Sequence, residues 1–206
     1  MAPSMSIESQ SLRLRTFARD LRRAVRDDND RVARGLMHKL DMANLMVDRL
    51  PEKHFRMLCS VIRSRPFRRS NNAARHVLHL FRRDQWDNLS SSQKRRLLVQ
   101  LEWLYPKVTA SAWELCFVTT VLLGENFRDE KALNVLLRLA SVPRESSRSL
   151  VPHGLEHIVR DSGDTALAAA ALEKLRQMAE DPSAQVRDEV ALSMARIERT
   201  RSERSQ

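Results

Sequence analysis

Glycine, tyrosine and cysteine are scarce in this sequence. Its 206 residues include four glycines, one tyrosine and two cysteines, and only 5% of the residues are aromatic. So few glycines leave little material for tight β-hairpin turns. No stretch alternates apolar and polar residues as a half-buried strand does. We therefore expect an all-α protein.

Long apolar runs are also lacking. The longest, residues 115–123, contains two threonines and has about half the length that a bilayer requires. Residues 1–10 have neither the basic start nor the apolar core of a secretory signal. We expect a cytoplasmic protein with no membrane span. Cys59 and Cys116 lie in apolar helical stretches, which favours buried thiols over a disulfide.

Most signatures of catalysis are missing. No glycine-rich phosphate loop or Gly-x-Ser-x-Gly occurs. His153, Glu156 and His157 do have the H-x-x-E-H spacing of inverted zinc peptidases. A third ligand would have to come from elsewhere, and such peptidases are much larger α/β chains. The weaker pair His76 and His79 has no cysteine nearby. We expect structural roles for these side chains, and no metal, cofactor or enzymatic activity.

The net charge of +10 is unevenly distributed. Residues 1–103 hold 22 Lys and Arg against 11 Asp and Glu, whereas residues 104–206 hold 14 against 15. Such asymmetry indicates an acidic or polyanionic partner for the front half. Arginine outnumbers lysine 30 to 6, so the codon bias of a GC-rich genome and a merely solvated surface explain the charge equally well.

Four prolines mark a repeat. Pro66, Pro106, Pro143 and Pro182 are 40, 37 and 39 residues apart, and each lies between two apolar runs of helical period. A period near 40 with two helices per period is typical of an α-solenoid.

The last two repeats superimpose at an offset of 39 residues. Before the proline, the matched positions are Leu133, Leu136, Leu139 and Ala140 with Leu172, Leu175, Met178 and Ala179. After the proline, they are Arg148, Val151, Leu155 and Ile158 with Arg187, Val190, Met194 and Ile197.

The organisation that follows has four parts. We expect a flexible N-terminus over 1–10, capping helices over 11–50, a repeat array over 51–198 and a flexible tail over 199–206, with about ten helices in all. Among these helices, single ones are predicted over 30–50, 144–160 and 183–198, and Gly124 is expected to end the helix over 109–123 in a left-handed conformation. The expected core positions include Val32, Leu36, Leu40, Met42, Leu45, Met46, Leu97, Leu98, Leu101 and Leu104.

The final unit resembles a HEAT repeat. In that family an aspartate-proline turn precedes a helix that begins with valine and arginine, as Asp181, Pro182, Val186 and Arg187 do here. Further matches are Ala171, Leu172, Leu175, Met178, Ala179, Val190 and Ala191. The resemblance implies a right-handed α-solenoid of antiparallel helix pairs that acts as a binding scaffold.

Two enzyme types with HEAT-like folds fit poorly. Deoxyhypusine hydroxylases use several His-Glu dipeptides, and none occurs here. HEAT-like DNA glycosylases cradle DNA with tryptophans and an aspartate. Of the three tryptophans, Trp103 and Trp113 lie among leucines, which predicts core packing. Only Trp86, in a polar turn, is expected to be free to stack.

Two functions remain open. The first is a non-enzymatic scaffold or adaptor for a partner protein, and the basic charge favours an acidic partner. The alternative is a nucleic-acid-binding subunit that contacts phosphates. Either would use a set of basic side chains and one tryptophan in the front half. These are Arg15, Arg19, Arg22, Arg63, Arg65, Arg68, Arg69, Arg75, Arg82, Arg83, Trp86, Arg95 and Arg96.

Overall fold

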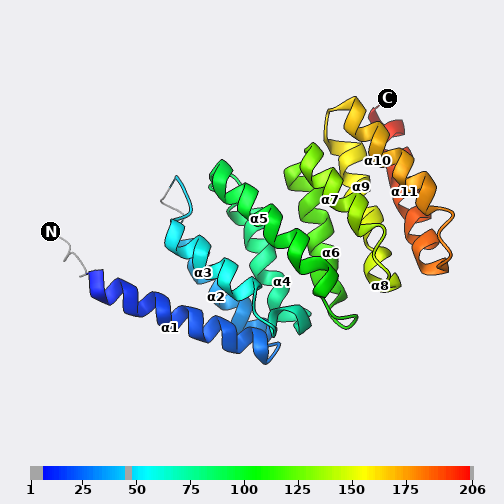
Figure 1. Cartoon of the computed structure of the whole chain (residues 1–206). Coiled ribbons are helices and arrows are strands. Elements are labelled where there is room, and N and C mark those ends of the chain that lie inside the picture. Colours follow the sequence, from blue (N-terminus) through cyan, green and yellow to red (C-terminus); the bar gives the residue numbers. More distant parts are fainter. Residues whose placement is uncertain (1–6, 45–47, 205–206) are drawn as a thin grey trace. The chain divides into compact units, whose positions relative to one another are not determined.

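The computed structural model describes residues 7–44 and 48–204, with side chains from residue 13 onward. All regular secondary structure in these ranges is helical (Figure 1), so the prediction of an all-α protein is confirmed. The chain divides into two compact units, residues 1–100 and 101–206. The boundary that the sequence suggested at residue 50 therefore falls inside the first unit.

Among the residues that the structure describes, five α-helices begin in the first unit. They are α1 (Ile7–Arg26), α2 (Asp30–Asn44), α3 (Glu52–Ile62), α4 (Asn72–His79) and α5 (Ser91–Leu104), of which α5 continues past the boundary. A 3-10 turn, η1 (Phe67–Arg69), follows Pro66, and a π-helix, η2 (Leu80–Asp84), extends α4.

The second unit has the same kinds of element. Its helices are α6 (Trp113–Val121), α7 (Glu130–Leu139), α8 (Glu145–Arg148), α9 (Val151–Asp161), α10 (Thr165–Met178) and α11 (Ala184–Arg204). The 3-10 turn η3 (Tyr105–Lys107) contains Pro106, and the π-helix η4 (Leu122–Phe127) extends α6. No described helix has the length and apolarity that crossing a membrane requires.

In the first unit, helices two apart in the chain lie side by side. α1 contacts α3, and α2 contacts α4. Near the start of α2, Asp30 Oδ1 lies 2.7 Å from His76 Nε2 of α4. Toward the other ends of these elements, Gln85 Nε2 donates to Asp41 Oδ1 at 2.7 Å. The first contact joins the early parts of the two elements and the second joins their late parts, so α2 and α4 run parallel.

The second unit shows the same relation between α9 and α11. His153 Nε2 lies 3.1 Å from Glu189 Oε2, and further along Arg204 Nη1 donates to the carbonyl of Arg160 at 2.9 Å. α9 also contacts α6, α7 and α10. Its buried face includes Val151, Leu155 and Ile158, which supply the apolar contact.

Arg148 and Arg187, matched by the 39-residue offset, make equivalent contacts. Arg148 Nη1 donates to the carbonyls of Val142 and Pro143 at 2.9 and 3.1 Å. Arg187 Nη1 donates to those of Asp181 and Pro182 at 2.7 and 3.0 Å. Arg148 also forks onto the Asp181 carboxylate at 2.7 and 2.9 Å. It thereby joins the two turns and lowers the pKa of Asp181.

Several predicted helix boundaries are wrong. α2 ends at Asn44 and residues 48–50 are not helical, so the helix does not reach Leu50. The expected core positions Leu45 and Met46 lie outside the described residues. A break at 149–150 divides the single helix predicted over 144–160 into α8 and α9.

The ends of the chain also differ from the prediction. α1 begins at Ile7, inside the segment expected to be a flexible N-terminus, and α11 continues to Arg204, inside the expected tail. Residues 1–6 and 205–206 lie outside the described ranges. α11 gains hydrogen bonds from Thr200 and Ser202 hydroxyls to the carbonyls of Arg196 and Glu198, which accompany its extension.

Three apolar side chains expected in the core are exposed instead. In α2 the buried stripe is Ala33, Met37 and Leu40, so Val32 and Met42 point to solvent. Trp113, at the start of α6, is 51% exposed. Here the apolar character of the residue was misleading, because the spacing of its neighbours decides which face of the helix is buried.

Asp28 ties the corner between α1 and α2 to the start of α4. Its φ of +47° is a left-handed conformation that aspartate tolerates better than most residues. Its Oδ1 accepts from the backbone N–H groups of Asn72 and Ala73, both at 2.9 Å, and from Ser70 Oγ at 2.7 Å. Burial acts to raise the pKa of Asp28, but these hydrogen bonds outweigh it and lower the pKa.

We expect Asp28→Ala to destabilise the first unit by about 2 kcal/mol, since it orphans two helix-terminal N–H groups and places alanine in a left-handed conformation. The neighbouring Asp27 only pairs with exposed arginines, so Asp27→Ala should change stability by less than about 0.5 kcal/mol. Denaturant unfolding of both variants measures the difference. Equal losses would show that the Asp28 contacts are unimportant.

Gly124 and Gly154 let η4 and α9 touch backbone to backbone. A Cβ at Gly124 would lie 2.0 Å from the Gly154 carbonyl oxygen, and a Cβ at Gly154 would lie 2.6 Å from the Thr120 carbonyl oxygen. The left-handed residue that ends η4 is Arg128, with φ +48°. The sequence had suggested Gly124 for that stop, so the glycine serves close packing instead.

Gly154→Ala should therefore cost the second unit more than about 3 kcal/mol, because backbone must move to admit the methyl group. At Gly35, which is exposed on α2, an added Cβ would have no other atom within 4 Å. Gly35→Ala should stabilise by about 1 kcal/mol through helix propensity. Thermal unfolding followed by circular dichroism tests both, and a stabilising Gly154→Ala would refute the close contact.

Candidate functional site

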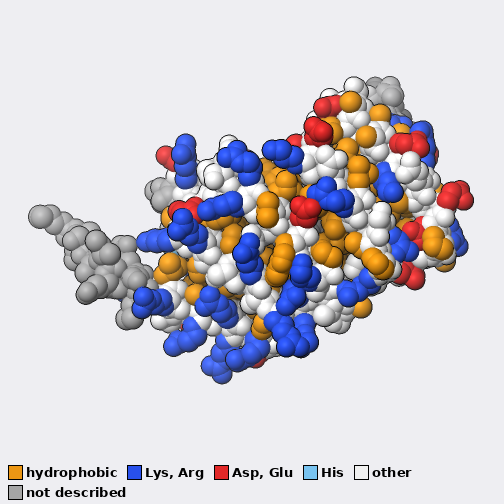
Figure 2. Space-filling model, viewed as in Figure 1, with side chains coloured by type: hydrophobic (Ala, Val, Ile, Leu, Met, Phe, Trp, Pro, Cys, Tyr) orange, Lys and Arg blue, Asp and Glu red, His pale blue; other side chains and the backbone are white. Residues whose placement is uncertain are grey.

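A basic groove runs between α3 and α5 in the first unit. Its volume is about 560 Å³, and Figure 2 shows basic side chains gathered over the surface of this unit. The lining residues are Phe55, Arg56, Cys59, Ser60, Arg63, Ser92, Arg95, Arg96, Val99 and Gln100.

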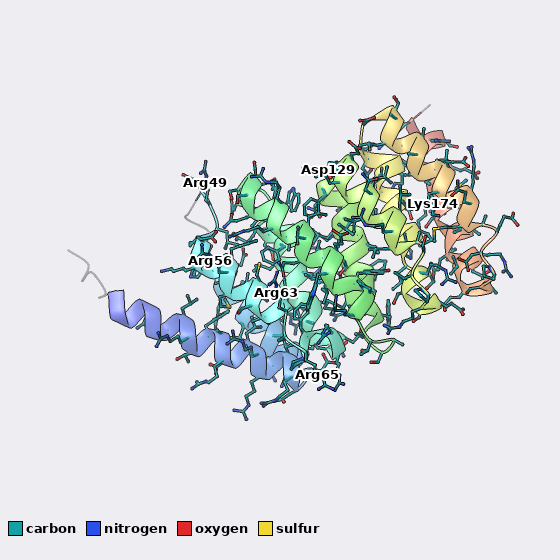
Figure 3. All side chains as sticks on the ribbon, in the orientation of Figure 1. Arg49, Arg56, Arg63, Arg65, Asp129 and Lys174 are labelled. Atoms are coloured by element: carbon teal, nitrogen blue, oxygen red, sulfur yellow. The ribbon has the colours of Figure 1, made fainter. Side chains whose placement is uncertain are left out.

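Helical spacing explains how α3 contributes a basic wall. Phe55, Leu58 and Ile62 face the core. Arg56 and Arg63, seven residues apart, share another face of the helix. Figure 3 shows both side chains extending from α3, with Arg65 just beyond its end. The sequence therefore builds one wall of the groove from a single amphipathic helix.

α5 supplies the second wall and runs parallel to α3. Arg96 binds Glu52, the first residue of α3, and Gln100 binds Arg63, which follows the last residue of α3. Arg96 Nη1 and Nη2 donate to the two carboxylate oxygens of Glu52 at 2.8 and 2.9 Å. Arg56 Nε donates to the same carboxylate at 2.6 Å. These hydrogen bonds lower the pKa of Glu52 to about 2.

Three arginines around the groove are held by neutral groups or by none. Arg63 Nε donates to Gln100 Oε1 at 2.6 Å. Arg22, from α1, donates to Ser60 Oγ at 2.9 Å and so reaches the rim. Within the described part of the chain, Arg22, Arg63 and Arg95 form no salt bridge. Their charges are therefore uncompensated by any described carboxylate of the unit.

The floor of the groove is apolar. The Arg96 guanidinium stacks 4.6 Å from the centroid of the buried Phe55 ring. Beside it, Val99 is 57% exposed although it is aliphatic. Cys59 is half-buried, and burial raises the pKa of its thiol to about 11. Both cysteines are free thiols, and Cys116 is buried.

The predicted basic residues do not form one cluster. Arg22, Arg63, Arg95 and Arg96 meet at the groove. The others lie elsewhere on the first unit. Arg15 and Arg19 are exposed on α1, Arg65 and Arg69 line a smaller hollow with Asp28, Arg68 is in η1, Arg75 pairs with Asp30 in the α2–α4 layer, and Arg82 and Arg83 are in η2.

Trp86 is not the open stacking platform that the sequence suggested. Lys94 Nζ lies 4.4 Å from the centroid of its ring, which is half-buried. Trp103 has a similar cation, Lys107 Nζ, at 4.6 Å. Lysine over an aromatic face is an attractive contact, so both rings already have a partner within the protein.

The side chains of the H-x-x-E-H motif are engaged with other polar side chains of the protein. His153 contacts Glu189, and His157 Nδ1 lies 3.1 Å from Asp161 Oδ2. Glu156 is 3% exposed and accepts from Arg160 and Arg196 at 2.7 and 3.1 Å. Across the ranges that the structure describes, no group of three or more His, Cys, Asp or Glu side chains could hold a metal ion.

His76 and His79 also have structural surroundings. His76 contacts Asp30 and makes a tilted ring contact with His79. Burial, together with the positive charges of Arg83 and Arg82, lowers the pKa of His79 to about 4. His79 is therefore neutral at physiological pH.

Sequence reasoning overlooked Glu52, Arg56 and Val99. The spacing from Glu52 to Arg56 is the i, i+4 pattern of a helical ion pair, so that signal was available. Arg96, which makes the stronger fork to Glu52, lies 44 residues away. Only the packing of α3 against α5 reveals that contact.

The fold and site define an all-helical protein whose first unit carries a groove lined with arginine. No protein-family model, curated protein or solved structure matches the chain.

The low pKa of His79 predicts a stability change with pH. The unfolded chain takes up a proton near the ordinary value of 6.5, but the folded chain does so only near 4. Stability should therefore fall as pH drops through this interval. In His79→Gln the thermal midpoint should fall less between about pH 7 and about pH 5 than in the parent. Identical shifts would contradict the assignment.

Proposed function

We propose that the chain is a non-enzymatic, HEAT-like binding scaffold of the cytoplasm, which engages an acidic partner protein through its first unit. A solenoid of antiparallel helix pairs explains two regularities. Helices two apart in the chain run parallel, as α2 and α4 do. The turns at Pro143 and Pro182 receive the same arginine contacts. Repeat scaffolds of this kind offer extended surfaces for partners.

The observation that carries the proposal is that three arginines at the groove lack a counterion, although Glu52 pairs with Arg56 and Arg96. Arg22, Arg63 and Arg95 form no salt bridge with a described carboxylate. The first unit as a whole has 22 Lys and Arg against 10 Asp and Glu. A surface of this charge attracts acidic partners and speeds their association.

Binding to nucleic acid is a second candidate. It is favoured by exposed arginines outside the groove, Arg65, Arg69 and Arg83, which form no salt bridge within the described ranges. Together with the groove they would make a broad basic surface for phosphates. Such contacts are weakly sequence-specific and strongly salt-dependent.

The test is a double charge reversal, Arg63→Glu with Arg95→Glu. Fluorescence anisotropy would measure binding of labelled polyglutamate and of duplex DNA at low and near-physiological salt. We expect the double variant to bind polyglutamate at least about tenfold more weakly, because it removes two uncompensated cations and adds repulsion.

The matched control is Lys131→Glu with Arg199→Glu, which makes the same change in net charge at exposed positions of α7 and α11. It should bind almost as the parent does. Equal losses in the two double variants would mean that net charge alone attracts the probe. Tighter binding to duplex DNA than to polyglutamate would favour the second candidate.

A further inference from the structure

We propose that the α3–α5 groove takes a short segment of a partner protein in which an aliphatic side chain stands beside carboxylates. The aliphatic side chain packs against Val99, and the carboxylates bind Arg63 and Arg95. This inference rests on the function proposed above and adds the chemistry of the bound segment.

The first step concerns Val99. Its side chain is 57% exposed in a groove whose other α5 contributions include Arg95 and Arg96. The Arg96 guanidinium lies over the Phe55 ring, and Val99 offers an uncharged surface next to it. A segment that carried charge alone would leave this surface in water. A side chain such as leucine removes it from water.

The second step concerns Arg63. A carboxylate partner would neutralise it, but its partner here is the neutral amide of Gln100, at 2.6 Å. This contact orients the guanidinium and uses only one of its five N–H donors. Arg22 is held in the same way by the Ser60 hydroxyl. A pre-oriented guanidinium with its charge intact suits an incoming carboxylate, because little side-chain freedom is lost on binding.

The third step gives the groove a direction. At the start of α3, Glu52 already occupies Arg56 and Arg96. At the other end, Arg63 and Gln100 lie without a carboxylate from the described part of this chain. Of the uncompensated arginines, Arg22 and Arg63 lie toward this end. Arg95 precedes Arg96 and so lies nearer Glu52. The segment therefore places most of its carboxylates at the Arg63 end and one near Arg95. Glu52 is an internal competitor for the same type of contact.

These features favour a protein segment over a nucleic-acid backbone. α3 has 11 residues, so the groove is about 16 Å long. About five extended residues cover that length. Such a segment places one or two aliphatic side chains against Val99 and carboxylates against the arginines. A phosphate backbone supplies charge but no aliphatic side chain for Val99.

The probes are labelled peptides of about ten residues, which exceed the groove length, and a single-stranded oligonucleotide of equal charge. One peptide consists of glutamate and serine. In the other, leucine replaces the serines. Anisotropy titrations against the full chain should show the leucine peptide binding about tenfold more tightly than the serine peptide.

Val99→Ser should bring the affinity for the leucine peptide down to that for the serine peptide and leave the latter unchanged. Val32→Ser is the matched control, because Val32 is 44% exposed on α2, away from the groove. It should preserve the difference between the peptides. Glu52→Gln should tighten binding of both peptides several-fold, since it releases Arg56 and Arg96. Misfolding cannot produce such a gain.

The outcomes separate this inference from the proposed function. If both peptides bind equally and Val99→Ser changes nothing, the inference is overturned, whereas the scaffold with an acidic partner stands. If neither peptide binds, both are overturned. If the oligonucleotide binds more tightly than either peptide, the inference fails and the nucleic-acid candidate gains support.

Discussion

Polar contacts between side chains more than forty residues apart set the alignment of neighbouring helices in the first unit. The pairs Asp30–His76, Asp41–Gln85 and Glu52–Arg96 are 46, 44 and 44 residues apart. Apolar surfaces hold helices together without fixing how far one slides along the other. Directional hydrogen bonds between charged and polar groups fix that position. The walls of the groove stand opposite each other because the Glu52–Arg96 and Arg63–Gln100 contacts align α3 with α5.

The two layers of the first unit use their charges differently. Between α2 and α4, Arg75 and His76 meet Asp30, so their contacts involve a carboxylate. Between α3 and α5, Arg63 is held by an amide, and at the rim Arg22 is held by a hydroxyl. An amide or hydroxyl orients a guanidinium but leaves its charge in place. The difference gives one layer a structural role and leaves the other with charge available for binding.

How far the sequence predicts this structure depends on whether the contact is local. Helical periodicity located the buried residues of α5, Leu97, Leu98, Leu101 and Leu104, which are all in the core. In α2 it failed at Val32 and Met42, since the buried stripe passes through Ala33 and Met37. The role of Asp28 was beyond reach, because its partners in α4 lie more than forty residues away. For the same reason the arginine-rich segments suggested one large basic site, and only packing showed which arginines meet.

The contact between the turns at Pro143 and Pro182 also bears on how a further turn could be added. Arg148 makes this contact, because it binds the carbonyls of its own turn and the carboxylate of Asp181 in the next. Counted from the proline of each turn, the residue that corresponds to Arg148 after Pro106 is Ser111, and the residue that corresponds to Asp181 before Pro143 is Val142. Both members of the ion pair are therefore replaced together. Arg187 has the carbonyl contacts but forms no salt bridge among the described residues. A further turn of the same kind, with its own aspartate and arginine, would pair its aspartate with Arg187 and leave only its own arginine without a carboxylate.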